Sequence, residues 1–252
     1  MKKKILILIS LLLVVLAGGF LINRRFDKTR GTLPAPSIES SNRSFSPSPE
    51  KSLNPLSPEA SSLPDAYLIK NFPFQPQAPY ANWDELHDEA CEEASVILVY
   101  YYLKNIAIDA SVMEEQIQKM VAFEIDKFGS HKDLTVQETG EVAKGFYGLE
   151  NFRIENNITL EDIKGEVAQN HPVIVPAAGR LLGNPYFRSP GPLYHMVVVI
   201  GYQGNNIIVQ DVGTRRGDHY EYNQKIFFNA IHDWNGAPET IEQGKKTMLV
   251  FE

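Results

Sequence analysis

HMVVVIGYQGNNIIVQD, residues 195–211, is the stretch of sequence that decides the fold of this chain. It holds two apolar runs rich in Val and Ile on either side of Gln203-Gly204-Asn205, a pattern typical of an antiparallel β-hairpin. The first run is so apolar that we expect a strand buried on both faces. The sequence therefore predicts a sheet built around this hairpin, with His195 and Asp211 at its open end.

The length of the hairpin loop decides whether these two polar residues share a face of the sheet. Because side chains alternate between faces along a strand, His195 and Asp211 lie on one face only if the loop has an odd number of residues. The loop Gln203-Gly204-Asn205 meets this condition and places Asp211 diagonally opposite His195. An Asp in that position can fix the tautomer of the imidazole, and the second ring nitrogen then remains free to face a nucleophile.

The residues around this hairpin predict four helices and two further strands. Ser111 with Glu114, and Thr135 with Glu138, are typical of capping boxes, and apolar residues recur at helical spacing from Cys91 onward. The predicted helices cover residues 91–103, 111–127, 135–148 and 159–170, and the further strands cover 171–178 and 246–252. Helices followed by an antiparallel sheet indicate an α+β fold.

Composition and charge exclude several classes of function. The chain has 252 residues, of which 43% are hydrophobic and 22% charged, as in ordinary globular proteins. Residues 66–252 carry 26 acidic against 15 basic side chains without a basic cluster, so we expect no nucleic-acid partner, because phosphate binding needs concentrated positive charge. The lone Cys91 excludes an internal disulfide and a zinc site with two thiolates. No metal-ligand spacing is present among the remaining histidines, His131, His171, His219 and His232, so we expect neither a metal nor a cofactor.

Residues 1–30 predict an N-terminal membrane anchor with basic flanks. Ile5–Ile22 is an apolar run of 18 residues without a charge, just long enough to cross the hydrocarbon core of a bilayer. A cleaved secretory signal, which would make the protein secreted, is the alternative. We expect a retained anchor because the apolar run continues beyond the small residues 17–19. We then expect the domain to be extracytoplasmic and attached to the cell membrane. The four residues before the apolar run are more easily kept inside the cell than a folded domain.

Residues 31–65 predict a disordered linker. They hold seven Pro and ten Ser in 35 residues, and they have too few large apolar side chains to offset the entropy lost on ordering. Residues 66–252 are long enough to form one domain with its own core. The predicted organisation is therefore an anchor (1–30), a linker (31–65) and a single domain (66–252).

Cys91 stands where an extended segment becomes a helix. Unpaired amides and the dipole at a helix N-terminus stabilise a thiolate, so this position favours a reactive cysteine. The alternative is a buried structural cysteine. Glu92 and Glu93 follow directly, and carboxylates close to a thiolate raise its pKa, so the two effects oppose each other.

Four short segments carry a resemblance to a known family. They are Gln77-Ala-Pro-Tyr-Ala-Asn-Trp83, Ala90-Cys91-Glu-Glu-Ala-Ser95, His195-Met-Val-Val-Val-Ile-Gly201 and Asp211-Val-Gly-Thr214. With them the chain resembles the papain-like cysteine peptidases of family thirty-nine, the bacteriocin-processing or double-glycine type, in the branch without a transporter part. The resemblance covers residues 71–252 and implies a papain-like fold. Many relatives follow the cysteine with Gly-Pro, whereas this chain has Glu92 and Glu93.

The resemblance also implies a role for each residue of the site. Cys91 would be the nucleophile, His195 the general base and acid, Asp211 the residue that orients the imidazole, and Gln77 the oxyanion donor. A side-chain amide beside the nucleophile can donate a hydrogen bond to an oxyanion, and loss of such a donor costs about 100- to 1,000-fold in rate. Gln75 is the alternative donor, and a purely structural glutamine is another.

The roles of several other side chains near these segments have two interpretations each. His87 and Asp88 offer another base, or they are exposed loop residues. The Gly- and Pro-rich segment 180–194 directly before His195 is either a wall of a cleft or an ordinary surface loop. Its possible substrate contacts are Leu181, Leu182, Tyr186, Phe187 and Arg188. Trp83 and Trp234 are expected to anchor the core rather than to contact a ligand.

These features predict a thiol hydrolase that cleaves a peptide or isopeptide bond through an acyl-cysteine intermediate. The alternative is a catalytically silent module on the same fold that binds a peptide or a cell-wall ligand. The expected partners are a peptide or protein substrate and, through the N-terminal helix, the membrane. The sequence predicts no particular oligomeric state.

Overall fold

The computed structural model describes residues 63–252 of the chain. The predicted anchor, residues 1–30, and residues 31–62 of the predicted linker lie outside this part. Among residues 63–252, no helix has the length and the apolar character needed to cross a membrane.

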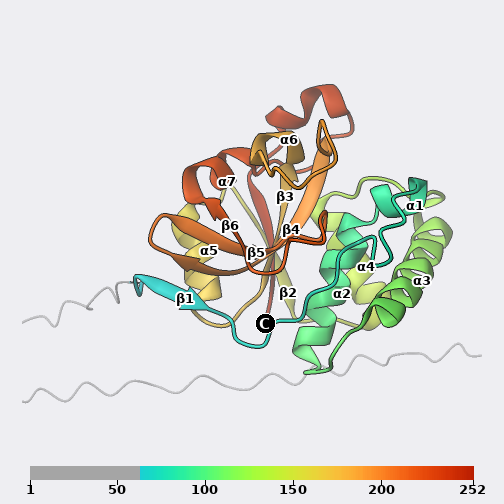
Figure 1. Cartoon of the computed structure of the whole chain (residues 1–252), viewed down its shortest axis with the longest axis horizontal. Coiled ribbons are helices and arrows are strands. Elements are labelled where there is room, and N and C mark those ends of the chain that lie inside the picture. The colour runs from blue at the N-terminus through green and yellow to red at the C-terminus, as the bar shows by residue number, and fades with distance from the viewer. Residues whose placement is uncertain (1–62) are drawn as a thin grey trace, which may run out of the picture. The chain divides into compact units, whose positions relative to one another are not determined.

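One seven-stranded sheet organises the described residues (Figure 1). The strands are β1 (Ala66–Leu68), β2 (Phe152–Asn156), β3 (Val173–Ala178), β4 (Tyr194–Gln203), β5 (Asn206–Gln210), β6 (Tyr220–Asn223) and β7 (Thr247–Phe251). Their order in the sheet is β2-β7-β3-β4-β5-β6, β1 also pairs with β4, and all pairs are antiparallel. Nine of the ten residues of β4 are buried, as its apolar sequence predicts.

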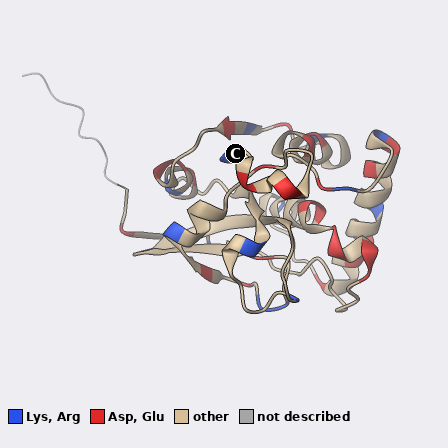
Figure 2. Ribbon diagram, turned by 90° about the horizontal axis from the view of Figure 1, so that it is seen from above, with Lys and Arg blue, Asp and Glu red and all other residues tan. Residues whose placement is uncertain are grey.

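Helices cover both faces of this sheet. They are α1 (Glu85–Asp88), α2 (Cys91–Leu103), α3 (Ala110–Phe128), α4 (Val136–Tyr147), α5 (Leu160–Val167), α6 (Gly179–Leu182), α7 (Gln224–Ala230) and the 3-10 helix η1 (Pro238–Gln243). Figure 1 shows α2, α3 and α4 on one side of the sheet, with α5 and α7 on the other. The α+β fold expected from the sequence is therefore observed. In Figure 2 acidic residues are spread along the ribbon, and several of them lie at the end of the domain where Figure 1 places α1 and α3.

Local sequence signals set the ends of two of these helices as predicted. The helix α2 begins at Cys91 and ends at Leu103. The helix α4 has the predicted capping box, because the Thr135 side chain accepts from the backbone N–H of Glu138 and the Glu138 carboxylate accepts from the backbone N–H of Thr135. The capping box of α4 lies within four residues of the helix end that it determines, whereas α2 has no capping side chain and follows from apolar residues at helical spacing.

The capping box predicted for Ser111 and Glu114 is wrong. The helix α3 begins one residue earlier, and Asp109 caps it by accepting from the backbone N–H of Val112 at 2.9 Å. An Asp at the N-cap supplies the acceptor that the free amides of the first turn need. The Glu114 carboxylate is therefore free for a contact with another element, and its Oε2 lies 3.0 Å from Nε2 of His87.

The loop between β4 and β5 is shorter than predicted. Gln203 pairs directly with Asn206, so the loop has two residues, 204–205, instead of three. With this even number, a regular hairpin would place His195 and Asp211 on opposite faces of the sheet.

A β-bulge in β4 compensates for the shorter loop. The register shifts by one residue between Val199 and Gly201. Continued by one step past the last pair, Asp211 faces Val197, two residues from His195. The bulge thus restores the diagonal arrangement on one face that the sequence predicts for a different reason.

The strand β1, which the sequence does not predict, pairs with β4 next to this bulge. The backbone N–H of Ile69 donates to the carbonyl of Ile200 at 2.8 Å. A side chain at Gly201 could not fit there, because a Cβ would lie 2.7 Å from the carbonyl oxygen of Tyr67. The close approach of β1 therefore depends on glycine at this position.

The helix α2 is buried on all sides in its first half. All residues from Cys91 to Val99 are buried, including Glu92 and Glu93, each 1% exposed. The sequence predicts only a buried stripe. The difference arises because α2 packs between the sheet and the helices α3 and α4, and it brings two carboxylates into the interior next to Cys91.

Candidate active site

Cys91 is the first residue of α2 and has a buried side chain, 4% exposed. Its Sγ donates a hydrogen bond to Oε2 of Glu92 at 2.9 Å. Burial, and after it the charge of Glu92, raise the pKa of the Cys91 thiol well above its ordinary value. The helix N-terminus alone would lower this pKa, but here burial and the carboxylate outweigh it, so the resting group is a thiol.

His195 and Asp211 form the hydrogen-bonded pair that the sequence of the hairpin predicts. Nε2 of His195 lies 2.8 Å from Oδ1 of Asp211, and neither side chain is more than 1% exposed. Because a carboxylate only accepts, Nε2 carries the proton of this hydrogen bond. Nδ1 is then the nitrogen that remains for another partner.

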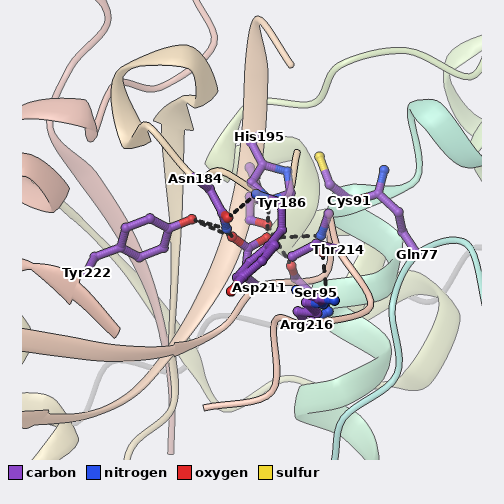
Figure 3. A network of polar contacts seen from close by, with 12 residues as sticks. Gln77, Cys91, Ser95, Asn184, Tyr186, His195, Asp211, Thr214, Arg216 and Tyr222 are labelled. Atoms are coloured by element: carbon purple, nitrogen blue, oxygen red, sulfur yellow. Dashed lines mark hydrogen bonds and ion pairs between the residues drawn. The ribbon is translucent and has the colours of Figure 1, made fainter. Parts of the chain in front are cut away.

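Three further groups hold the Asp211 carboxylate (Figure 3). The backbone N–H of Gly213 donates to Oδ1 at 3.0 Å, and Oδ2 accepts from Nδ2 of Asn184 at 2.9 Å and from the Tyr222 hydroxyl at 2.5 Å. Burial by itself would raise the pKa of Asp211, but His195 and the hydrogen bonds from Tyr222 and Asn184 outweigh it and lower the pKa. The carboxylate therefore stays ionised although it is fully buried.

Sequence reasoning missed Asn184 and Tyr222. Asn184 follows α6, and Tyr222 lies in β6, 38 residues further along the chain. The alternating Tyr-Glu-Tyr-Asn of residues 220–223 could have revealed the strand. Nothing in the sequence indicates that its tyrosine meets Asp211.

The His195 ring is enclosed by Phe187 and Gly213. The edge of the Phe187 ring packs against the imidazole, with centroids 5.3 Å apart and an angle of 83° between the rings. A Cβ at Gly213 would lie 2.8 Å from Cε1 of His195. Only a glycine therefore leaves room for the imidazole in this orientation.

Gln77 is buried beside Cys91, whereas Gln75 lies elsewhere. Nε2 of Gln77 donates to the carbonyls of His87 at 2.7 Å and Asp88 at 3.2 Å. The amide carries two hydrogens, so one can still point into the cleft if the two carbonyls share the other. Gln75 instead donates to the carbonyl of Ile108 and does not line the cleft. This placement favours Gln77 over Gln75 as the oxyanion donor.

The interpretation of His87 as an exposed loop residue is wrong. Its side chain is buried, with Nδ1 2.6 Å from Oδ1 of Asp84 and Nε2 3.0 Å from Oε2 of Glu114. Both ring nitrogens are therefore engaged, which leaves none for Cys91. Asp88 is exposed, as expected, and lines the cleft.

A cleft of about 900 Å³ joins the predicted site residues. Gln77, Cys91 and His195 all line it, and in Figure 3 the Cys91 sulfur projects between the imidazole and the Gln77 amide. Asp211 lies behind His195 and does not line the cleft. The remaining walls include Trp83, Asp88, Glu89, Asp133, residues 186–194, residues 213–216, Trp234 and Pro238.

The cleft walls correct two sequence expectations. Trp83 and Trp234 are both half-buried and line the cleft. Trp234 also packs against the hydrophobic core, as expected, whereas Trp83 does not. Of the suggested contacts in segment 180–194, Tyr186, Phe187 and Arg188 line the cleft. Leu181 and Leu182 do not, because the short helix α6 holds them away from it.

Residues 69–239 match the model of the Peptidase_C39 like family. The chain belongs to this family. The C39-like fold also appears in a crystal structure from Bacillus anthracis that is described as a C39-like peptidase, with a TM-score of 0.50. The two share 16% sequence identity, and the match covers 75% of this chain and 98% of that chain, so the likeness concerns the fold. None of the curated proteins compared with the chain is significantly similar to it.

Proposed function

We propose that this protein is a thiol hydrolase that cleaves a peptide or isopeptide bond through an acyl-cysteine intermediate. The observation that carries the proposal is the buried His195–Asp211 pair, 2.8 Å apart, in a cleft that Cys91 and Gln77 also line. Membership of a C39-like peptidase family supports the same chemistry.

In the proposed first step, Nδ1 of His195 takes the proton from Cys91, and Sγ attacks the carbonyl carbon of the scissile bond. The Gln77 amide and the free backbone N–H of Cys91 donate to the developing oxyanion. The protonated imidazole then gives its proton to the leaving amine, and the acyl group remains on sulfur. Water, deprotonated by His195, releases the acid and restores the thiol.

The hydrogen bond from Cys91 to Glu92 in the resting protein adds a step to this proposed mechanism. Because the thiol donates to Glu92 in the resting protein, it must exchange this acceptor for His195 before it can attack. The raised pKa of Cys91 means that proton transfer accompanies attack instead of preceding it as a stable ion pair.

The hydrogen bond between Cys91 and Glu92 also favours a second candidate function. A thiol that is buried and bonded to Glu92 is also what a catalytically silent module would hold in its cleft. Such a module would bind a peptide or a cell-wall ligand without turnover.

Peptide-library cleavage read by mass spectrometry distinguishes the two candidates. The full chain, its Cys91→Ser variant and its His195→Ala variant are incubated with the library, and retained peptides are measured in parallel. The hydrolase proposal expects cleavage by the wild-type chain alone. Equal peptide binding by wild type and Cys91→Ser, with no cleavage by either, would leave the silent module as the function.

We also propose that residues 1–30 anchor the protein in the cell membrane with the domain outside. The support is the uncharged apolar run of 18 residues at Ile5–Ile22. Membrane fractionation followed by protease treatment of intact cells tests both points. Recovery of a shortened chain from the medium would instead indicate a cleaved signal.

A further inference from the structure

Three ionisable side chains from separate elements meet at Glu93, two residues after Cys91. Glu93 comes from α2, Glu124 from α3, and His131 from the segment between α3 and α4. One carboxylate oxygen of each Glu and one imidazole nitrogen all lie within 4.8 Å of one another. Glu93 and Glu124 are at most 1% exposed, and the His131 side chain is 13% exposed, so the cluster is buried with one edge near solvent.

Four polar atoms of this cluster have no hydrogen-bond partner among the described residues. This holds for both carboxylate oxygens of Glu93, for Oε2 of Glu124 and for Nε2 of His131. Nε2 of His131 and Oε1 of Glu93 are 3.2 Å apart, which is an ion pair when the imidazole is protonated, but the geometry is not that of a hydrogen bond. Buried carboxylates in proteins are normally paired, hydrogen-bonded or bound to a metal.

Neighbouring Glu92 shows that burial on α2 does not by itself leave a carboxylate without partners. Its Oε1 accepts from the backbone N–H of Leu134 at 2.9 Å, and its Oε2 accepts from Cys91. Glu93, one residue further on and buried to the same degree, has no donor on either oxygen. The cluster thus holds two buried carboxylates against one side chain, His131, that can carry a positive charge.

We propose that Glu93, Glu124 and His131 bind a divalent transition-metal ion, with zinc as the best fit. Two ligands at roughly 2.0–2.1 Å from a tetrahedral zinc ion lie roughly 3.3 Å apart, close to the 3.2 Å between Nε2 of His131 and Oε1 of Glu93. Two carboxylates balance the charge of the ion, and the imidazole favours zinc over calcium or magnesium. The solvent-facing edge at His131 leaves room for water as a fourth ligand.

A backbone contact already orients one of the proposed ligands. The backbone N–H of Lys132 donates to Oε1 of Glu124 at 3.0 Å, which leaves Oε2 free to face the cluster. Hydrogen bonds of this kind to the second oxygen of a ligating carboxylate are typical of metal sites.

A bound ion would connect this cluster to the cleft. The segment between α3 and α4 carries Asp133, which lines the cleft, and Leu134, whose N–H holds Glu92. An ion that ties His131 to α2 and α3 would fix this segment. The proposed role is therefore structural, and it acts on the surroundings of Cys91 without contact to a substrate.

Zinc binding is tested in the full chain carrying Cys91→Ser, so that the thiol cannot act as a ligand. After dialysis against a chelator, the protein is titrated with zinc sulfate by calorimetry, and its thermal unfolding is followed with and without zinc. We expect one zinc ion per chain and a higher Tm with zinc. Glu124→Gln and His131→Ala should each lower the affinity at least tenfold. His219→Ala, an exposed histidine paired with Asp218, is the matched control and should leave the affinity unchanged.

A spectrum provides a second readout that does not depend on stability. Cobalt(II) in the same protein should give visible d–d bands without a thiolate charge-transfer band, and His131→Ala should weaken them. His131 lies at the solvent edge, so this variant is the least disruptive to folding.

Two results would overturn the proposal. One is the absence of zinc binding in the Cys91→Ser chain, or an affinity that both ligand variants leave unchanged. The other is a Glu124→Gln variant whose Tm rises and does not respond to zinc, because the carboxylates would then share a proton. Since zinc binding and Tm are read in a Cys91→Ser background that lacks the thiol, the outcome is independent of the proposed hydrolase activity.

Discussion

Buried charge is compensated differently on the two sides of the cleft, the sheet side with His195 and Asp211 and the helix side with Cys91 and α2. On the sheet side, each oxygen of Asp211 receives two hydrogen bonds, and the carboxylate stays ionised beside His195. On the helix side, Cys91 is followed by two buried carboxylates, and Glu93 has no donor among the described residues. The sheet side therefore holds its charge with hydrogen bonds, whereas on the helix side the imidazole of His131 is the group that can pair with the buried Glu93 and Glu124, so one of these carboxylates still needs a proton or a bound cation.

The largest effect expected is from removal of the helix-side nucleophile. Cys91→Ala should lower peptide cleavage on the order of 10⁴-fold or more, because no other side chain can carry the acyl group. The unfolding free energy should change far less, since alanine still fills most of the site. Library cleavage by mass spectrometry and urea denaturation measure the two quantities. Retained cleavage would show that the helix side does not supply the nucleophile.

Asp211→Asn changes the sheet side of the cleft and should cause the second-largest loss of cleavage. We expect cleavage to fall by about 10² to 10⁴-fold, because an amide cannot fix the imidazole tautomer in the same way. Removal of one partner of the buried pair should also destabilise the fold by about 3–5 kcal/mol.

The pH dependence of this loss has a defined sign. The pKa of Asp211 is lowered in the folded state, so its contribution to stability is present above the unfolded value of about 3.9 and is lost as the pH falls through the folded value. The stability difference between wild type and Asp211→Asn should therefore shrink below about pH 4, as measured by urea denaturation at several pH values. Asp218→Asn, at an exposed Asp–His pair, is the control. A difference that does not change with pH would contradict the assignment.

Glu92→Gln should reduce the difference between the two sides of the cleft, because it removes a buried carboxylate from the helix side. Removal of the carboxylate beside the thiol should lower the pKa of Cys91, because Glu92 is, after burial, the main cause that raises it. The pH midpoint of iodoacetamide alkylation should fall, and the rate at neutral pH should rise several-fold in metal-free protein. Glu85→Gln in α1, at an exposed position, should leave both unchanged. An unchanged midpoint would mean that Glu92 carries a proton and not a charge in the folded protein, since burial also raises the pKa of Glu92.

The smallest effect concerns one hydroxyl on the sheet side. Tyr222→Phe removes a donor to Asp211 and should cost about 1–3 kcal/mol of stability, with less than a tenfold loss of cleavage. The matched control is Tyr202→Phe, because the Tyr202 hydroxyl is buried without a hydrogen-bond partner among residues 63–252. Its removal should be neutral. Equal costs for both variants would show that packing, and not the hydrogen bond, explains the loss.

Local sequence signals were enough for much of the fold and for the main candidates of the site. The start of α2 at Cys91, the Thr135 cap of α4 and the apolar run of β4 each depend on residues close in sequence. The ordered segments around Gln77, Cys91, His195 and Asp211 also led to the family whose model matches residues 69–239.

Only the tertiary structure decided how charges are compensated around these residues. Asn184 reaches Asp211 across 27 residues of sequence, and Leu134 reaches Glu92 across 42. His195 and Asp211 share a face because a bulge offsets a loop of even length, which no spacing rule could foresee. Periodicity and capping report a residue's own element, whereas the partner of a buried charge comes from another element that the packing brings beside it.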